Sequence, residues 1–185
     1  MSKEDFAITG TVDKAVAVDQ ARRGSYQFAM QYFHFCKVLY ENFGRDQAMD
    51  LVRQAIYNLA IDRSEQMRQR AQAQGVGMDT VEDYRAVTDL PKCGWVPEWG
   101  KDHCPYGALW RTYFDKNPWF REFAPFYCDV IDTTTIENFT RRLSHRITNN
   151  VMLGGEKCER IYYECDDTKA GKYTYAKNQN KARSV

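Results

Sequence analysis

The sequence predicts an α+β fold, in which a helical N-terminal part packs with a small antiparallel β-hairpin in the C-terminal half. Two observations support this prediction. Apolar residues recur at helical spacing in several stretches between residues 19 and 139, whereas residues 143–165 alternate between apolar and polar side chains. Gly154 and Gly155 separate the two alternating runs, and glycine at such a place is typical of a tight turn between antiparallel strands.

The helical part is expected to begin with an antiparallel helix pair. The first helix starts near Asp19 and presents one apolar stripe, formed by Phe28, Tyr32, Phe35, Leu39 and Phe43. Gly44 predicts its end, because glycine commonly terminates helices. A second helix follows from about Asp46 to Gln74 and ends at Gly75. Two helices joined at one glycine are expected to pack in opposite directions.

Four further elements are expected before the hairpin. In chain order they are a short helix over 80–88, an irregular segment over 89–103, a helix from Cys104 to about Tyr113, and a helix over 119–139. Thr80 and Asp83 have the spacing of a capping box, and Asn117-Pro118 separates the last two helices. Trp95 and Trp99 in the irregular segment are expected to be buried, because a tryptophan ring is large and apolar.

The length, net charge and cysteine content of the chain limit which classes of protein it can belong to. The chain of 185 residues is expected to form one domain over 1–185, with an irregular arm over 1–18 and a polar tail over 166–185. Its net charge is +1, so neither nucleic acid nor a membrane surface is an expected partner. The six cysteines form no CxxC pair, which favours a reduced cytoplasmic protein. The long, partly apolar helices are compatible with a homo-oligomer.

Cys104 is the leading candidate for a reactive side chain. Proline is favoured at the first position of a helix, so Pro105 places Cys104 at or near the N-cap. Free backbone N–H groups and the helix dipole favour negative charge there, and they are expected to hold the thiol as a nucleophilic thiolate. The alternative is that Cys104 is a small buried hydrophobic residue that happens to precede a helix.

Cys128, Asp129 and Asp132 are candidate partners of Cys104, because their spacing places both Cys128 and Asp129 on the same helical face as Asp132. A carboxyl group beside an apolar cleft can have the raised pKa that suits general acid–base chemistry. The alternative is that Asp132 only caps a helix. His103 is a further catalytic candidate, although neighbouring side chains diverge and an ordinary surface role is favoured. His145 reaches the site only if folding brings its strand there.

Candidate substrate-binding residues surround these positions in the sequence: they are Tyr106, Trp110, Arg111, Tyr127 and Cys158. The aromatic residues form either core or an apolar pocket, and Cys158 either lines that pocket or packs under the hairpin turn. Arg111, Arg141 and Arg146 are candidates to pair with a substrate carboxylate. His103, Cys104, Cys128 and Cys158 lack the paired spacing of structural zinc, so neither a metal nor a cofactor is expected.

Three motifs resemble the L-2-amino-thiazoline-4-carboxylic acid hydrolase family: Cys-Pro-Tyr-Gly (104–107), Phe-Tyr-Cys-Asp-Val-Ile-Asp (126–132) and Gly-Gly-Glu-Lys-Cys (154–158). With Leu39–Gly44, the resemblance spans roughly residues 35–165. It implies a cytoplasmic hydrolase that opens a cyclic isothiourea toward a carbamoyl-cysteine product by cleaving a C–S or C–N bond. Two alternatives remain: a small-molecule or cofactor binding protein with an aromatic-lined pocket, and a thiol-based redox or metal-binding protein.

Overall fold

The computed structural model describes residues 11–140 and 142–164. Most of the expected arm, residue Arg141, Cys165 and the expected polar tail therefore lie outside the described residues. Within them the α+β class is confirmed, because helices are followed by a two-stranded antiparallel sheet. None of the described helices has a stretch long and apolar enough to cross a membrane.

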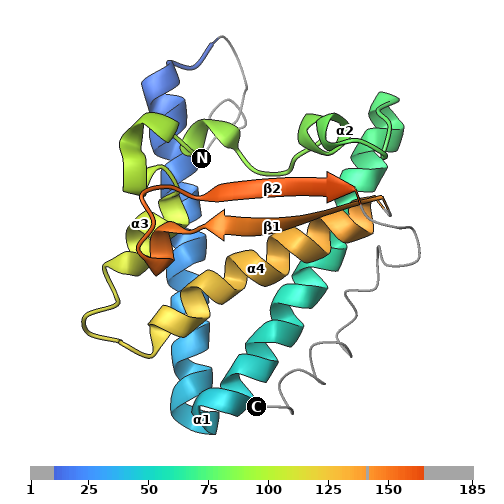
Figure 1. Cartoon of the computed structure of the whole chain (residues 1–185). Coiled ribbons are helices and arrows are strands. Elements are labelled where there is room, and N and C mark those ends of the chain that lie inside the picture. Colours follow the sequence, from blue (N-terminus) through green and yellow to red (C-terminus); the bar gives the residue numbers. More distant parts are fainter. Residues whose placement is uncertain (1–10, 141, 165–185) are drawn as a thin grey trace, which may run out of the picture.

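Helix α1 (Lys14–Gln74) contains both halves of the expected helix pair. Its backbone leaves helical geometry at Gly44, where φ is 74° and ψ is 174°, a conformation that favours glycine. The chain reverses there, and the two halves of α1 run in opposite senses and diverge from this point (Figure 1). The helix pair and its break at Gly44 are therefore confirmed.

The start of α1 corrects the boundary of the expected arm. Asp13 is the N-cap, and its carboxylate accepts hydrogen bonds from Ala15 N (2.8 Å) and Val16 N (3.3 Å). Such a cap satisfies backbone donors that have no partner within the helix. The helix consequently begins at Lys14, earlier than the expected Asp19, and residues 14–18 do not belong to an irregular arm.

The expected stripe on the N-terminal half of α1 is only partly buried: Tyr32 lies in the core, and Phe28 and Leu39 pack against it. The residues that face the core are Ala29, Tyr32, Phe33 and Cys36. Phe35 is instead 61% exposed and Phe43 is 49% exposed. Two overlapping apolar stripes fit the same helical period, and the sequence alone does not show against which of them the later helices pack.

The later elements follow the expected order. They are α2 (Val81–Ala86), α3 (Pro105–Arg111), α4 (Phe120–Phe139), β1 (Leu143–Asn149) and β2 (Glu159–Glu164). The capping box of α2 is confirmed, with Asp83 N donating to Thr80 Oγ1 and Thr80 N donating to Asp83 Oδ2. Helix α4 lies between α1 and the hairpin and contacts both (Figure 1).

The connection of the hairpin is longer than the expected tight turn. Leu143 pairs with Glu164 and Asn149 with Glu159, so the strands are antiparallel as expected. A 3₁₀ turn over Val151–Leu153 then precedes Gly154, whose φ is 95°. The Asn150 carboxamide accepts a hydrogen bond from Met152 N and holds this turn in place. The turn packs against α3, which brings two distant parts of the chain together.

The core is dominated by aromatic rings from α1, α3 and α4. Trp110 is fully buried, contacts the rings of Tyr32, Phe120 and Tyr127, and donates from Nε1 to Ala29 O at 2.8 Å. Tyr32 donates its hydroxyl to Phe123 O at 2.9 Å. These bonds satisfy the polar ends of two large buried rings, so α3 and α4 are fixed on α1 by packing and by hydrogen bonds together.

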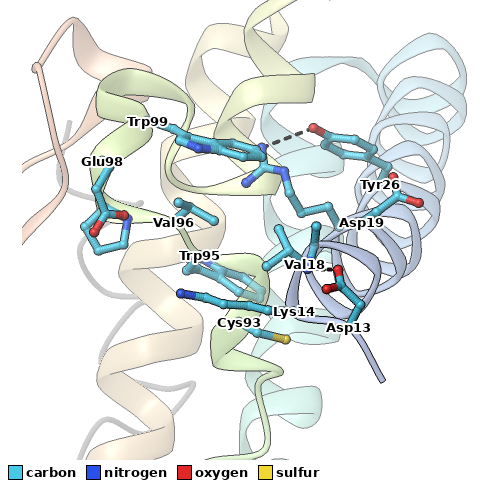
Figure 2. A pocket seen from close by; sticks show the side chains of 13 residues that line it. Asp13, Lys14, Val18, Asp19, Tyr26, Cys93, Trp95, Val96, Glu98 and Trp99 are labelled. Atoms are coloured by element: carbon cyan, nitrogen blue, oxygen red, sulfur yellow. Dashed lines mark hydrogen bonds between the residues drawn. The ribbon is translucent and has the colours of Figure 1, made fainter. Parts of the chain in front are cut away.

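A buried arginine holds the segment before α3, and Trp95 of this segment is partly buried against Tyr106. Trp99 is 50% exposed, so the expectation that it is buried is wrong. Arg22 of α1 is buried, and its guanidinium donates to the carbonyls of Gly94, Asp102 and His103. Trp99 lies over that guanidinium at 4.5 Å and faces Tyr26 of α1 across it (Figure 2). A cation–π contact leaves one face of the indole in solvent.

Candidate functional site

Three cysteines from separate segments lie in one region of the fold. Cys104 is the N-cap of α3, Cys128 lies in α4, and Cys158 immediately precedes β2. They are close enough for Cys104 and Cys158 both to raise the pKa of Cys128. Gly107 permits this arrangement, because a Cβ there would lie 2.9 Å from Val151 Cγ2, where α3 meets the hairpin turn. The structure therefore brings together three residues that the sequence singled out.

An ion pair between Asp132 and Arg160 lies beside the cysteines. Asp132 Oδ2 accepts hydrogen bonds from Arg160 Nη2 at 2.6 Å and Nε at 3.1 Å, and both side chains are half-buried. Asp132 raises the pKa of Cys128, whereas Arg160 lowers the pKa of both Cys128 and Cys104. The convergence of Asp132 with the thiols agrees with the sequence expectation, while Arg160 was not anticipated.

A second ion pair lies on the other side of the same region. Arg63 of α1 and Asp89 form two hydrogen bonds of 2.6 and 2.7 Å. Burial opposes ionisation of Asp89, but the bonds and charge of Arg63 outweigh it and lower its pKa. Burial raises the pKa of Tyr106 to about 12, against the charge of Arg63. Tyr127, also an expected site residue, is buried beside Tyr106.

Asp132 and Arg160 line a pocket of about 340 Å³, here called the hairpin pocket, whereas none of the three cysteines lines it. It is lined by residues from α2, the following loop, α4 and both strands, namely Tyr84, Arg85, Thr88, Leu90, Lys92, Trp95, Asp132, His145, Arg160 and Tyr162. Three basic side chains against one carboxylate favour an anion, and three aromatic rings favour a planar molecule. The size is that of a small-molecule site.

Cys104 is not held as a thiolate in the resting protein. It is 8% exposed, and burial raises the pKa of its thiol despite the hydrogen bond from Gly107 N to Sγ at 3.5 Å. The expected N-cap position is confirmed, but the expected thiolate is wrong, because the loss of water around the sulfur outweighs the donors of a short helix. Burial raises the pKa of Cys128 further, and Asp132 adds to that rise.

Thiol labelling tests this protonation state. At neutral pH, iodoacetamide should modify the exposed Cys93 first and the buried Cys104 and Cys128 last, as followed by peptide mass mapping. Because the thiolate is the reacting form and burial raises the pKa of Cys104, the labelling rate of Cys104 should continue to increase into alkaline pH. Fast and selective labelling of Cys104 at neutral pH would contradict the buried, protonated state.

His145 lines the hairpin pocket although it was not an expected site residue. It is 3% exposed, and its Nδ1 lies 3.2 Å from Thr133 Oγ1. Its Nε2 is buried and has no hydrogen-bond partner among the described residues. Burial lowers the pKa of His145, with Arg160 adding to the effect and Asp132 opposing it. The ring is therefore neutral at physiological pH.

Four expected site residues lie elsewhere. Trp110 is fully buried in the core and has no surface for a substrate. Arg111 pairs with Asp102 and donates to Lys101 O, away from the hairpin pocket. His103 directs Nδ1 to Gly100 O at 2.8 Å. Asp129 is exposed on α4 and does not line the pocket, although burial of part of the carboxyl and the charge of Asp132 raise its pKa.

The other expected arginines do not complete the site. Arg146 is exposed on β1, and Arg141 lies outside the described residues. Four residues of this region were not expected from the sequence. Arg160 and His145 line the hairpin pocket, and Arg63 and Asp89 form the second ion pair. Arg63 lies in the part of α1 that is polar in sequence, where a charged residue ordinarily faces solvent, so no local signal distinguishes it. Arg160 occupies an alternate position of a predicted strand, but its partner is far away in the chain.

Three further pockets lie outside this region. The first, of about 880 Å³, is formed by the start of α1 and the segment with Trp95 and Trp99 (Figure 2). The second, of about 690 Å³, lies beside Trp99 and Arg111. The third, of about 470 Å³, is an apolar groove between the two halves of α1, bordered by Phe35, Val38 and Leu59. None of the three contains Asp132, Cys104, Cys128 or Cys158.

Within residues 11–140 and 142–164, no group of three or more His, Cys, Asp or Glu side chains is arranged to hold a metal ion. Comparison of the chain with protein-family models, with curated proteins and with solved structures finds no match.

Proposed function

We propose that this protein is a hydrolase that opens a small, planar, anionic heterocycle of the isothiourea type, with Cys104 as nucleophile. The observation that supports the proposal is the convergence of Cys104, Cys128 and Cys158 on the Asp132–Arg160 ion pair beside the hairpin pocket. These residues come from three segments far apart in the sequence. A purely structural role would not require a carboxylate and a guanidinium next to clustered thiols.

The pocket favours such a substrate by charge and by shape. Arg160 and the exposed Arg85 and Lys92 offer positive charge to a carboxylate. Tyr84, Trp95 and Tyr162 offer flat apolar surfaces to a ring. The resemblance of the three cysteine-containing motifs to thiazoline carboxylate hydrolases points to the same chemical class. Free thiols at all five described cysteines are compatible with the cytoplasmic location that we propose.

The surroundings of the two buried thiols favour Cys104 over Cys128 as the nucleophile. Gly107 N–H and the charge of Arg160 both stabilise a Cys104 thiolate. Cys128 instead has the carboxylate of Asp132 as a neighbour, which disfavours a second negative charge. Cys104 is protonated at rest, so its proton must leave when the substrate is bound.

The reaction then proceeds in two balanced steps. The Cys104 sulfur bonds to the carbon between the heteroatoms, one bond from that carbon to a ring heteroatom breaks, and the thiol proton passes through Asp132 to the departing heteroatom. Water then adds to the same carbon, the carbon–sulfur bond to Cys104 breaks, and the sulfur regains a proton. One water molecule is consumed and the ring is opened. Arg160 stabilises the negative charge that develops in each step.

A direct assay tests this function. The purified protein is incubated with L-2-amino-thiazoline-4-carboxylate, and mass spectrometry should show a product that has gained one water. Cleavage of C–S would release a new thiol, which a chromogenic disulfide reagent detects, whereas cleavage of C–N would not. Arg146→Gln, on the exposed side of β1, should retain full activity as a matched surface control. A folded protein that yields no hydrated product at stoichiometric concentration would refute the proposal.

A binding protein is the second candidate, because burial of Cys104 and Cys128 and their raised pKa values also suit structural thiols. In that case the thiazoline would bind and be recovered unchanged. Isothermal titration calorimetry followed by mass spectrometry of the recovered ligand separates the two functions. Heat of binding without hydrated product favours the binding protein.

A further inference from the structure

The His145 side chain carries an unexplained polar atom at the hairpin pocket. Buried polar atoms in folded proteins almost always have a hydrogen-bond partner, and an exception calls for a functional or structural explanation. His145 Nε2 is such an exception among the described residues, whereas Nδ1 has Thr133 Oγ1 at 3.2 Å. The ring is therefore oriented by one nitrogen, while the other is buried without a partner in a side chain that lines the pocket.

The charged surroundings of His145 come from every element that packs around it. Asp132 lies on α4, Arg160 and Tyr162 lie on the partner strand, and Tyr84, Arg85 and Lys92 line the same pocket. Tyr162 is directly opposite His145 in the strand register, with ring centroids 5.7 Å apart. Burial is the largest influence on the pKa of the ring and disfavours the imidazolium, so His145 is neutral and one of its nitrogens carries a lone pair.

The Asp132–Arg160 pair connects His145 to the cysteines. Both charges act on His145, and both also act on Cys128, so the ion pair lies near the histidine and near that thiol. The neutral tautomer with its proton on Nδ1 donates to Thr133 Oγ1 and leaves the lone pair of Nε2 free. A ring fixed in this way has the geometry that a general base requires.

We propose that His145 is the general base that activates the hydrolytic water, an inference that rests on the hydrolase function proposed above. Nε2 takes one proton from water as the water oxygen bonds to the carbon held by Cys104. The bond from that carbon to the Cys104 sulfur breaks, and the proton passes to the departing sulfur. His145 is then neutral again, and the step uses no other reactant. Thr133 acts as a positioning residue that orients the ring through its contact with Nδ1.

The test compares wild type, His145→Gln and Thr133→Val in the hydrolysis of L-2-amino-thiazoline-4-carboxylate across pH. Glutamine keeps a polar group near the position of Nε2 but does not titrate. We expect His145→Gln to lower kcat by about 10² to 10⁴ with little change in KM. In wild type, kcat/KM should fall with decreasing pH on an acidic limb below about pH 6.5, because only the neutral ring accepts a proton. Thr133→Val should keep most activity and shift that limb.

Nitrogen-15 NMR of the histidine ring adds a measurement that needs no turnover: Nε2 of wild type should be unprotonated at pH 7. A protonated Nε2, or wild-type kcat and an intact acidic limb in folded His145→Gln, would overturn the role of His145 while leaving the hydrolase function standing. An inactive wild type would instead refute the hydrolase function itself. If His145→Gln does not fold, the pH profile of Thr133→Val is the deciding measurement. An acidic limb of kcat/KM at the wild-type pH in that variant would contradict the proposal.

Discussion

Cys104→Ala should lose thiazoline hydrolysis almost completely, by about 10³-fold or more in kcat, because no other group then forms the covalent intermediate. The cost to stability should be small. The change removes one buried sulfur atom and one weak hydrogen bond from Gly107 N, so we expect a loss of about 1 kcal/mol in the free energy of unfolding. Steady-state kinetics and thermal unfolding of the same preparation measure both effects.

Cys128→Ala is the matched control for this variant. Cys128 is as buried as Cys104 and belongs to the same cluster, but Asp132 disfavours its thiolate. Its replacement should cost a similar amount of stability and keep kcat within about threefold, whereas the catalytic role predicted for Cys128 from the sequence would require a large loss of kcat. Retained activity in folded Cys104→Ala, or a loss of activity in Cys128→Ala alone, would remove Cys104 from the nucleophilic role.

Trp110→Ala should be among the most destabilising single substitutions in this chain. The fully buried indole fills the space between α1, α3 and α4, and replacing such a ring with alanine costs about 3–5 kcal/mol. For a protein of this size the melting temperature should fall by roughly 6–20 °C. Differential scanning calorimetry measures the effect, and a shift of only a degree or two would contradict the core position of Trp110.

Trp110→Phe separates packing from substrate contact. It keeps an aromatic ring but removes the bond from Nε1 to Ala29 O, so it should cost about 1–2 kcal/mol. Because Trp110 has no exposed surface, KM for the thiazoline should not change. A large increase in KM with an unchanged melting temperature would instead restore the substrate-binding role that the sequence suggested.

Local backbone signals predicted most of the elements correctly. The Thr80–Asp83 capping box, the break at Gly44 and the N-cap position of Cys104 all depend on atoms within a few residues of each other. The wrong predictions concern the burial of side chains that pack against, or lie away from, segments distant in the sequence. Phe35 and Trp99 are apolar and were expected to be buried, but α4 packs against a neighbouring face of α1, and Trp99 lies over the buried Arg22 guanidinium with half of its surface exposed.

The candidate site was only partly predictable for the same reason. Cys104, Cys128, Asp132 and Cys158 were recognised as chemically notable residues, and the fold brings them together. Arg160 and His145 were not recognised as site residues, because their importance comes from Asp132 and Thr133 on another element. The pKa of Cys104 was expected to be lowered, but burial raises it. The N-terminal end of a helix can be recognised from the sequence, whereas the loss of solvent around a sulfur atom cannot.

The amino-acid sequence alone determined the α+β class, the order of the helices and the hairpin, and which thiols and carboxylates deserved consideration. These properties follow from periodicity, capping and glycine conformations, which act over one or two turns of the chain. Only the tertiary structure decided which carboxylate faces the thiols, which histidine borders the pocket and which rings are core. Burial and charge pairing set those outcomes, and both depend on segments that the sequence separates by dozens of residues.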